Sequence, residues 1–325
     1  ATVTIKNDDT ANVTIEDVSG NEDDGAITLT ASLDNEVQDG FSIVVSTQDG
    51  TATVADNDYT PISGQQITFA GTIGETQTFT VLPTADSNTE FDETFTVSMV
   101  NVNRNDDTPN VTDTATITII DDDAPVATSV IVPSDRTYKI GDNLDFTVTF
   151  SSAVNITGSP SIPLTIGSTT VNAVVNASVN ASTTVPFRYT VLEGDLDSDG
   201  ISVGNTIELN GGTIQSTNGN DAILTLNSVP STANVNIDGI NPTVVLSTKT
   251  SNPTNAPFTL TISMSEPIIG FDLTDINVSN GVADIFNQID ATTFTVRIEP
   301  TTDGDVDISI AEASFQDLAG NNNSA

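Results

Sequence analysis

The sequence predicts an all-β fold of antiparallel sandwiches arranged in tandem. Apolar and polar residues alternate in short runs along most of the chain, for example at residues 27–33, 144–150 and 258–262. This period of two is typical of strands that bury one face. Threonine and valine, which dominate the runs, are good strand formers. Clusters of glycine, asparagine and aspartate separate the runs at the spacing of all-β sandwiches, about 8–12 residues.

Two proline-containing joints divide the chain, one at Ala124-Pro125 and one at residues 237–242. We therefore expect a domain at residues 10–123, a second at 124–239 and a third at 240–325. Each is near the size of a Greek-key, immunoglobulin-like sandwich. Residues 1–9 repeat the pattern of residues 115–123, so we expect them to be the terminal strand of a preceding repeat in a longer chain. Because the joints are short, we expect the domains to sit end to end with limited freedom.

Composition excludes several classes of function. The chain has 45 acidic and 7 basic residues, a formal net charge of −38. Such a surface repels nucleic acid and anionic lipid, and no segment is apolar and long enough to insert into a membrane. The absence of histidine and cysteine excludes Ser-His-Asp and Cys-His catalysis and the usual zinc sites. We expect no enzymatic activity.

Carboxylates gather in the turns of the first expected domain. Residues 1–123 hold 24 of the 45 acidic residues, and the last strand ends in the run Asp121-Asp122-Asp123. Two such charges 4 Å apart repel by roughly 4 kcal/mol at an effective dielectric constant of 20. Every second turn of an antiparallel sandwich lies at the same end, so the acidic turns converge on one pole. Calcium takes 6–8 oxygen ligands in flexible geometry, and it is the cation that the pattern predicts.

Residues 10–123 resemble the Calx-β domain family. The matching segments occur in the family's order, at residues 21–25, 49–53, 57–61, 74–76, 90–97 and 119–123. The resemblance implies several calcium ions at one pole, held by Glu22, Asp49, Asp86, Glu90, Glu93, Asp121, Asp122 and Asp123. Where the family often has an acidic pair, this chain has Ala85-Asp86, which leaves the number of ions open. Asp56 and Asp58 are interpreted as turn formers.

Ordinary solvated turn residues are the alternative interpretation of these acids, and for Asp49 or Asp86 alone it is favoured. Because Ala124-Pro125 follows the acidic run at once, we expect the pole to face the second domain.

Weaker metal candidates lie elsewhere in the chain. Residues 195–200 resemble the first half of an EF-hand loop, with Asp195, Asp197 and Asp199 at alternate positions. The twelfth position is Thr206 rather than glutamate, so a calcium-binding β-loop and a plain acidic turn both stay open. The other candidates, including the N-terminal run and the second joint, are Asp8, Asp9, Asp238, Asp272, Asp275, Asp303 and Asp317.

Segments at residues 138–148, 252–258, 265–267, 270–276 and 317–321 resemble immunoglobulin-like repeats of bacterial surface adhesins. The leading hypothesis is a calcium-stabilised stalk segment of a large cell-surface or secreted adhesin, acting in cell adhesion, biofilm formation or surface motility. Its expected partners are calcium, neighbouring repeats and an extracellular ligand, and its expected location is outside the cell. The alternatives are a glycan- or protein-binding tip, a calcium sensor, and a non-catalytic accessory region of a secreted enzyme.

Overall fold

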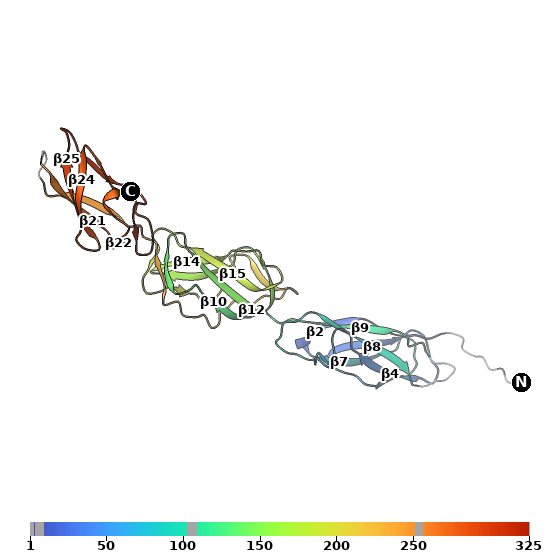
Figure 1. The fold of residues 1–325 in the computed structure, drawn as a ribbon. Helices are drawn as coiled ribbons and strands as arrows, with labels where there is room; N and C mark the ends of the chain where they lie inside the picture. Colours follow the sequence, from blue (N-terminus) through green and yellow to red (C-terminus); the bar gives the residue numbers. More distant parts are fainter. Residues whose placement is uncertain (1–2, 4–9, 103–108, 251–255, 325) are drawn as a thin grey trace.

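The computed structural model describes residue 3 and residues 10–102, 109–250 and 256–324. Across these residues the fold is all-β, as predicted, and the helical turns are two 3₁₀ segments, η1 (Glu22–Asp24) and η2 (Leu273–Asp275). Buried apolar residues form three clusters, at residues 11–119, 127–237 and 260–315. We call the surrounding segments the N-terminal, central and C-terminal units, and Figure 1 shows them following one another along a line. None of the described helical segments has the length and apolarity needed to cross a membrane.

The N-terminal unit packs a four-stranded sheet against a five-stranded one. The first sheet has the order β1 (Val13–Ile15), β3 (Ile27–Leu33), β7 (Thr76–Pro83), β5 (Tyr59–Thr60). The second has the order β2 (Val18–Asn21), β9 (Thr114–Ile120), β8 (Glu93–Asn101), β4 (Phe41–Gln48), β6 (Gln65–Phe69). Every second side chain of β3 is buried, so the predicted alternation forms the core, with Leu29, Ile43, Phe95 and Ile117 fully enclosed.

Strands β2 and β9 pair in parallel, from Val18 opposite Ile117 to Asn21 opposite Ile120. The chain changes sheet between β1 and β2, at Glu16 and Asp17, so β2 meets the last strand of the unit rather than the next one. In the described residues, β11 (Arg136–Lys139) and β19 (Val235–Asp238) form a second parallel pair. These two pairs depart from the antiparallel pairing of the other strands. The consequence is that β2 and β9 end side by side.

The central unit has a large sheet and a small one. The large sheet follows the order β10 (Ala127–Ile131), β12 (Asn143–Thr157), β15 (Ser182–Thr190), β14 (Thr169–Val175), β13 (Ser161–Ile166), β17 (Ser202–Val203), with β18 (Thr213–Ser216) also paired to β12. The small sheet has the order β11 (Arg136–Lys139), β19 (Val235–Asp238), β16 (Leu196–Asp197). Phe146, Phe150 and Phe187 fill the core.

The C-terminal unit has one four-stranded sheet and two strand pairs. The sheet has the order β20 (Val244–Thr248), β21 (Phe258–Met264), β25 (Thr293–Pro300), β24 (Gly281–Gln288). The pairs are β22 (Ile268–Ile269) with β27 (Gln316–Asp317), and β23 (Ile276–Ser279) with β26 (Asp307–Ile310). Phe271 contacts three other rings edge-on, at centroid distances of 5.6, 5.2 and 5.4 Å from Phe286, Phe294 and Phe315.

Candidate metal centre

The strand register brings acidic residues together at one pole of the N-terminal unit. Because Asn21 and Ile120 face each other at the ends of the parallel pair, Glu22 and Asp121 follow at the same edge of the sheet. Glu93 begins the neighbouring antiparallel strand β8 opposite Ile119. The connection between β7 and β8 carries Asp86 and Glu90. The acidic turns therefore converge as predicted, by a parallel pairing that was not predicted.

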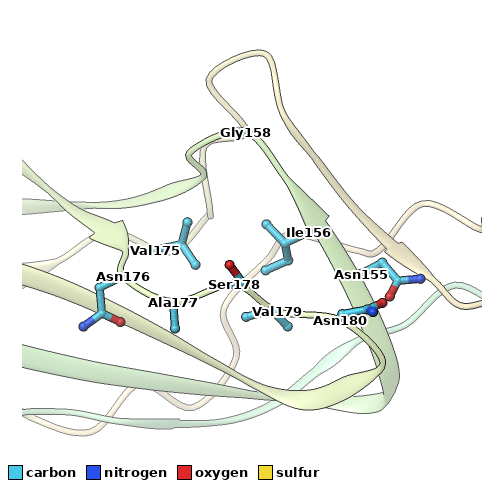
Figure 2. Close-up of a pocket in the computed structure, with 9 residues that line it drawn as sticks. All are labelled: Asn155, Ile156, Gly158, Val175, Asn176, Ala177, Ser178, Val179 and Asn180. Carbon is cyan, nitrogen blue, oxygen red and sulfur yellow. The ribbon is translucent and has the colours of Figure 1, made fainter.

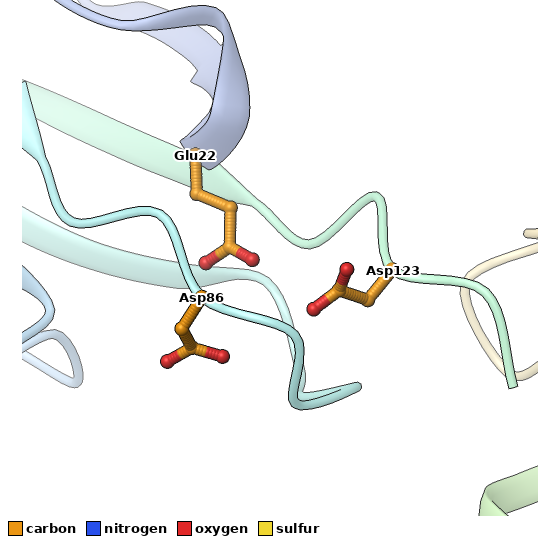
Figure 3. A group of neighbouring side chains, drawn as sticks. All are labelled: Glu22, Asp86 and Asp123. Carbon is orange, nitrogen blue, oxygen red and sulfur yellow. The ribbon is translucent and has the colours of Figure 1, made fainter. Parts of the chain in front are cut away.

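The carboxylates of Glu22, Asp86 and Asp123 form the first acidic group, with one oxygen of each within 4.8 Å of the others. Figure 3 shows these side chains arising from three separate segments, with the carboxylates of Glu22 and Asp123 turned toward each other. Like charges at this separation repel by about 3 kcal/mol per pair at an effective dielectric constant of 20. Lys6 and Arg104 are the only basic residues in residues 1–123, and neither belongs to the described residues. Nothing cationic in the described part of the unit offsets the repulsion.

Three carboxylate oxygens at this pole are buried and have no hydrogen-bond partner: Oε1 of Glu22 and the Oδ2 atoms of Asp121 and Asp123. Glu22 is only 7% exposed and Asp121 only 3%. An unpaired buried oxygen costs about 1–3 kcal/mol, and more when it is charged. Native proteins rarely leave such groups unsatisfied. These oxygens are therefore placed as cation ligands are.

A second acidic group joins Asp58, Glu90 and Glu93, again within 4.8 Å of one another. Its geometry follows from the core. Tyr59 stacks on Phe95 with centroids 3.9 Å apart and the rings nearly parallel. This stack fixes the turn that carries Asp58 against the first residues of β8, where Glu93 lies.

Burial and mutual repulsion raise the pKa of these acids. The pKa of Glu22 rises to about 7, mainly through desolvation and then through Asp86 and Asp123. Desolvation also raises the pKa of Glu93 to about 7, with Asp58 the next cause. The pKa values of Glu90, Asp121 and Asp123 are raised for the same two reasons. A bound divalent cation favours the ionised form of such carboxylates and removes the conflict.

The donor set fits calcium. Both groups offer only oxygen atoms, supplied by loops and by a 3₁₀ turn, and calcium accepts many oxygen ligands in adaptable geometry. Nitrogen and sulfur ligands, which zinc prefers, are absent from both groups. The residues that would hold the ions are Glu22, Asp58, Asp86, Glu90, Glu93, Asp121 and Asp123.

Not every predicted ligand joins these groups. Oδ1 of Asp49 accepts hydrogen bonds from the Tyr59 hydroxyl at 2.6 Å and from the Val54 amide at 3.2 Å. Asp122 is exposed and lies outside both groups. Metal ligation by Asp49 and Asp122 stays a prediction. Conversely, Asp58 was interpreted only as a turn former. Its carboxylate does accept a hydrogen bond from the Thr53 amide. The signal available in the sequence was the position of Asp58 in an acidic turn directly before Tyr59.

The acidic loop of the central unit is not assembled as a cluster. Oδ2 of Asp195 accepts from the Tyr189 hydroxyl and the Leu192 amide. Asp197 is buried and accepts from the amides of Gly167 and Asp199. Asp195, Asp197 and Asp199 belong to no acidic group in the described residues, and the carboxylates of Asp195 and Asp197 act as hydrogen-bond acceptors. Calcium binding by this loop stays a prediction.

A third acidic group lies at the second joint and combines Asp238, Glu266 and Asp317. Desolvation and Asp317 raise the pKa of Asp238, and desolvation, Asp238 and Asp317 raise that of Glu266. Asp317 is fully buried and accepts hydrogen bonds from Gly320 and Asn321. Asp238 and Asp317 were candidates from sequence. Glu266 was missed because its approach to them depends on how the two units meet.

The remaining candidates are dispersed. Asp272 and Asp275 form a capping box around η2, which explains their positions without a metal. Asp303 belongs to no acidic group in the described residues. Asp8 and Asp9 lie outside the residues that the structure describes.

A separate groove of about 600 Å³ lies in the central unit, between the end of β12 and the connection from β14 to β15. Figure 2 shows the Ser178 hydroxyl between Val175 and Ile156, with Asn155 and Asn180 to one side. The lining contains no ionisable side chain, so the groove does not resemble the acidic groups.

Comparison with known proteins gives two family matches. Residues 6–123 match the model of the Calx-beta domain, and residues 238–325 match that of a bacterial Ig-like domain. No curated protein matches the chain.

Solved structures that match the chain include the apo form of the Calx CBD1 domain, at 23% identity and TM-score 0.31, covering 35% of this chain and 100% of that one. CBD12 from CALX1.2 is 19% identical with TM-score 0.32, covering 61% and 81%. Invasin, a bacterial integrin-binding protein, is 14% identical with TM-score 0.28, covering 92% of this chain and 56% of that one.

Proposed function

We propose that the chain is a calcium-stabilised stalk segment of a large bacterial adhesin, because residues 6–123 match the Calx-beta domain model and residues 238–325 match that of a bacterial Ig-like domain. The three units are then tandem domains, at residues 10–123, 124–239 and 240–325, outside the cell. The observation that carries the proposal is the buried, unpartnered set of oxygens on Glu22, Asp121 and Asp123. A cation at this pole would satisfy them.

Calcium would act structurally in this role. Extracellular modules bind calcium with Kd of about 10⁻⁴–10⁻³ M, and at ten times that concentration each site adds about 1.4 kcal/mol to the free energy of unfolding. Removing the ions leaves repelling carboxylates at the pole. The first and second acidic groups both lie at the end of the N-terminal unit that precedes the first joint, so the stabilisation would also stiffen the array.

We extend the proposal to the second joint, where Asp238, Glu266 and Asp317 meet. Asp238 belongs to the last strand of the central unit, whereas Glu266 and Asp317 belong to the C-terminal unit. An ion shared by these residues would tie the two units together, and substitution of Glu266 would remove it without altering the N-terminal pole.

Calcium titration of the full chain by calorimetry tests the proposal. Glu22→Gln removes one buried charge from the first group, and we expect calcium binding at the pole to weaken by at least about tenfold, since ligand charge sets the affinity of oxygen sites. Glu36→Gln is the matched control, because Glu36 is an exposed acid of the same unit outside both groups. Equal binding by wild type and Glu22→Gln, or none by wild type, contradicts the proposal.

The groove of the central unit favours a second candidate function, that of a ligand-binding module. Amide and hydroxyl groups beside an apolar floor suit a neutral, hydroxyl-rich ligand rather than a cation. The lack of tryptophan in the chain argues against a strong sugar site. A glycan array screened with calcium present separates this function from a purely structural one.

A further inference from the structure

A turn of the central unit holds the loops that carry the N-terminal acidic groups. We call residues 216–223, which follow β18, the clamp turn. Nδ2 of Asn220 donates to the backbone oxygens of Asp121 at 3.0 Å and Asp123 at 3.3 Å. Nδ2 of Asn218 donates to the backbone oxygen of Glu90 at 3.2 Å and to Oδ1 of Asp92 at 3.3 Å. Two asparagine side chains thus contact both acidic segments from the neighbouring unit.

The same turn also fixes the linker. The Ile223 amide donates to the Pro125 oxygen at 2.8 Å, and Val126 forms a β-bridge with Ile223. The backbone oxygens of residues 121, 123 and 125 therefore all accept hydrogen bonds from the clamp turn. The clamp turn therefore holds the acidic run and the start of the linker by hydrogen bonds to every second backbone carbonyl.

The clamp turn is itself well ordered by local contacts. The Asn220 amide donates to Oγ of Ser216 at 3.0 Å, and the Ser216 amide donates to the Asn220 oxygen at 2.8 Å. Gly219 has φ of +100°, a conformation that L side chains rarely adopt. Gln215 also pairs with Asp221 through its side chain. The two amide donors are consequently presented by a hydrogen-bonded hairpin.

We propose that Asn218 and Asn220 are positioning residues that couple calcium binding at the N-terminal pole to the geometry of the first joint. This inference rests on the proposed calcium function. Asn220 restrains the backbone between Asp121 and Asp123, and Asn218 restrains the loop that carries Glu90. Holding ligands near their bound arrangement lowers the ordering cost of binding. Coupling is reciprocal, so calcium strengthens the clamp by the same factor by which the clamp strengthens calcium binding.

The test uses the full chain with the double substitution Asn218→Ala and Asn220→Ala. Calorimetry measures the calcium Kd. Electron spin resonance measures the distance between two spin labels, one on Thr78→Cys in the N-terminal unit and one on Thr170→Cys in the central unit. Because the chain has no cysteine of its own, the labels attach only at these two positions. The control is Asn172→Ala with Asn227→Ala, two exposed asparagines of the central unit whose side chains make no hydrogen bond within the described residues.

We expect the double variant to bind calcium about fivefold more weakly than wild type. Calcium should narrow the distribution of label distances in wild type and in the control, and should not narrow it in the clamp variant. An unchanged Kd and an unchanged narrowing in the clamp variant overturn the coupling while leaving the calcium function intact. Absence of calcium binding by wild type overturns both.

Discussion

At the N-terminal pole, burial and repulsion between like charges both act on the side chain of Glu22. It is almost fully buried, one of its oxygens has no partner, and Asp86 and Asp123 lie beside it. Without a cation, the side chain avoids the conflict by holding a proton, and its pKa accordingly rises to about 7. Protonation and calcium binding therefore compete for the same oxygens.

This competition predicts opposite pH dependences with and without calcium. In chelator, Glu22 and Glu93 have a folded-state pKa of about 7, against an ordinary value of 4.5. Their protonated side chains therefore contribute stability that is fully present below pH 4.5 and is lost as the pH rises through 7. Thermal melting in chelator should therefore give a lower Tm at pH 8 than at pH 5.

With saturating calcium the stabilisation by the ion should instead grow from pH 5 to pH 8, because ligands must be ionised. Acids whose pKa is lowered, such as Asp34 and Glu75, lose their contribution only at lower pH and do not obscure this window. Glu22→Gln should flatten the dependence in chelator. A Tm in chelator that is constant or rises between pH 5 and pH 8 contradicts this account.

At the scale of elements, the pole is positioned by strand ends and by one tightly docked turn. The segment after β4 packs against the start of β8, where the Ala52 amide donates to the Thr94 oxygen at 3.0 Å and the Thr94 amide to Oγ1 of Thr51 at 2.7 Å. Gly50 permits this contact, since a Cβ at that position would lie 2.3 Å from the Thr94 oxygen. The turn and Glu93 therefore move together.

Gly50→Ala is expected to push the turn away from β8, destabilise the chain by about 1–3 kcal/mol and weaken calcium binding. Gly74→Ala is the matched control. An added methyl at Gly74 meets no atom within 4 Å, but its φ of +76° makes the substitution strained, at a cost of about 1–2 kcal/mol. Urea unfolding should show that both variants are destabilised, whereas calcium titration should distinguish them. Equal calcium affinity in the two variants would argue against the role given to this turn.

Much of the element structure follows from sequence pattern, and some of it does not. Alternation over β3 and the spacing of turns were enough to predict the sandwiches and the convergence of acidic turns. The parallel β2–β9 pair was not predictable, because alternation does not reveal which strand a segment joins. Asp58 became a candidate ligand only through the stacking of Tyr59 on Phe95, a contact between residues far apart in sequence.

At the scale of the whole molecule, both joints are made by hydrogen-bonded contacts between units. The clamp turn closes the first. At the second, Lys139 Nζ donates to the Gly320 oxygen at 2.9 Å and Asn321 Nδ2 to the Asp238 oxygen at 2.7 Å. The boundaries at the proline-containing joints stay predictions, and no sequence pattern pointed to Glu266 at the second joint. Of its acidic partners, Asp317 lies on β27 of the same unit and Asp238 on β19 of the central unit, and only the assembled joint brings the three together.

Small-angle X-ray scattering of the full chain, in calcium and in chelator, measures whether calcium changes the stiffness of the array. If calcium sets the stiffness of the array, chelation should increase the conformational spread and change the maximum dimension, and Glu22→Gln in calcium should shift the curve toward the chelated one. Glu36→Gln should behave as wild type. Identical scattering curves in calcium and chelator, together with an unchanged Tm, would contradict the account.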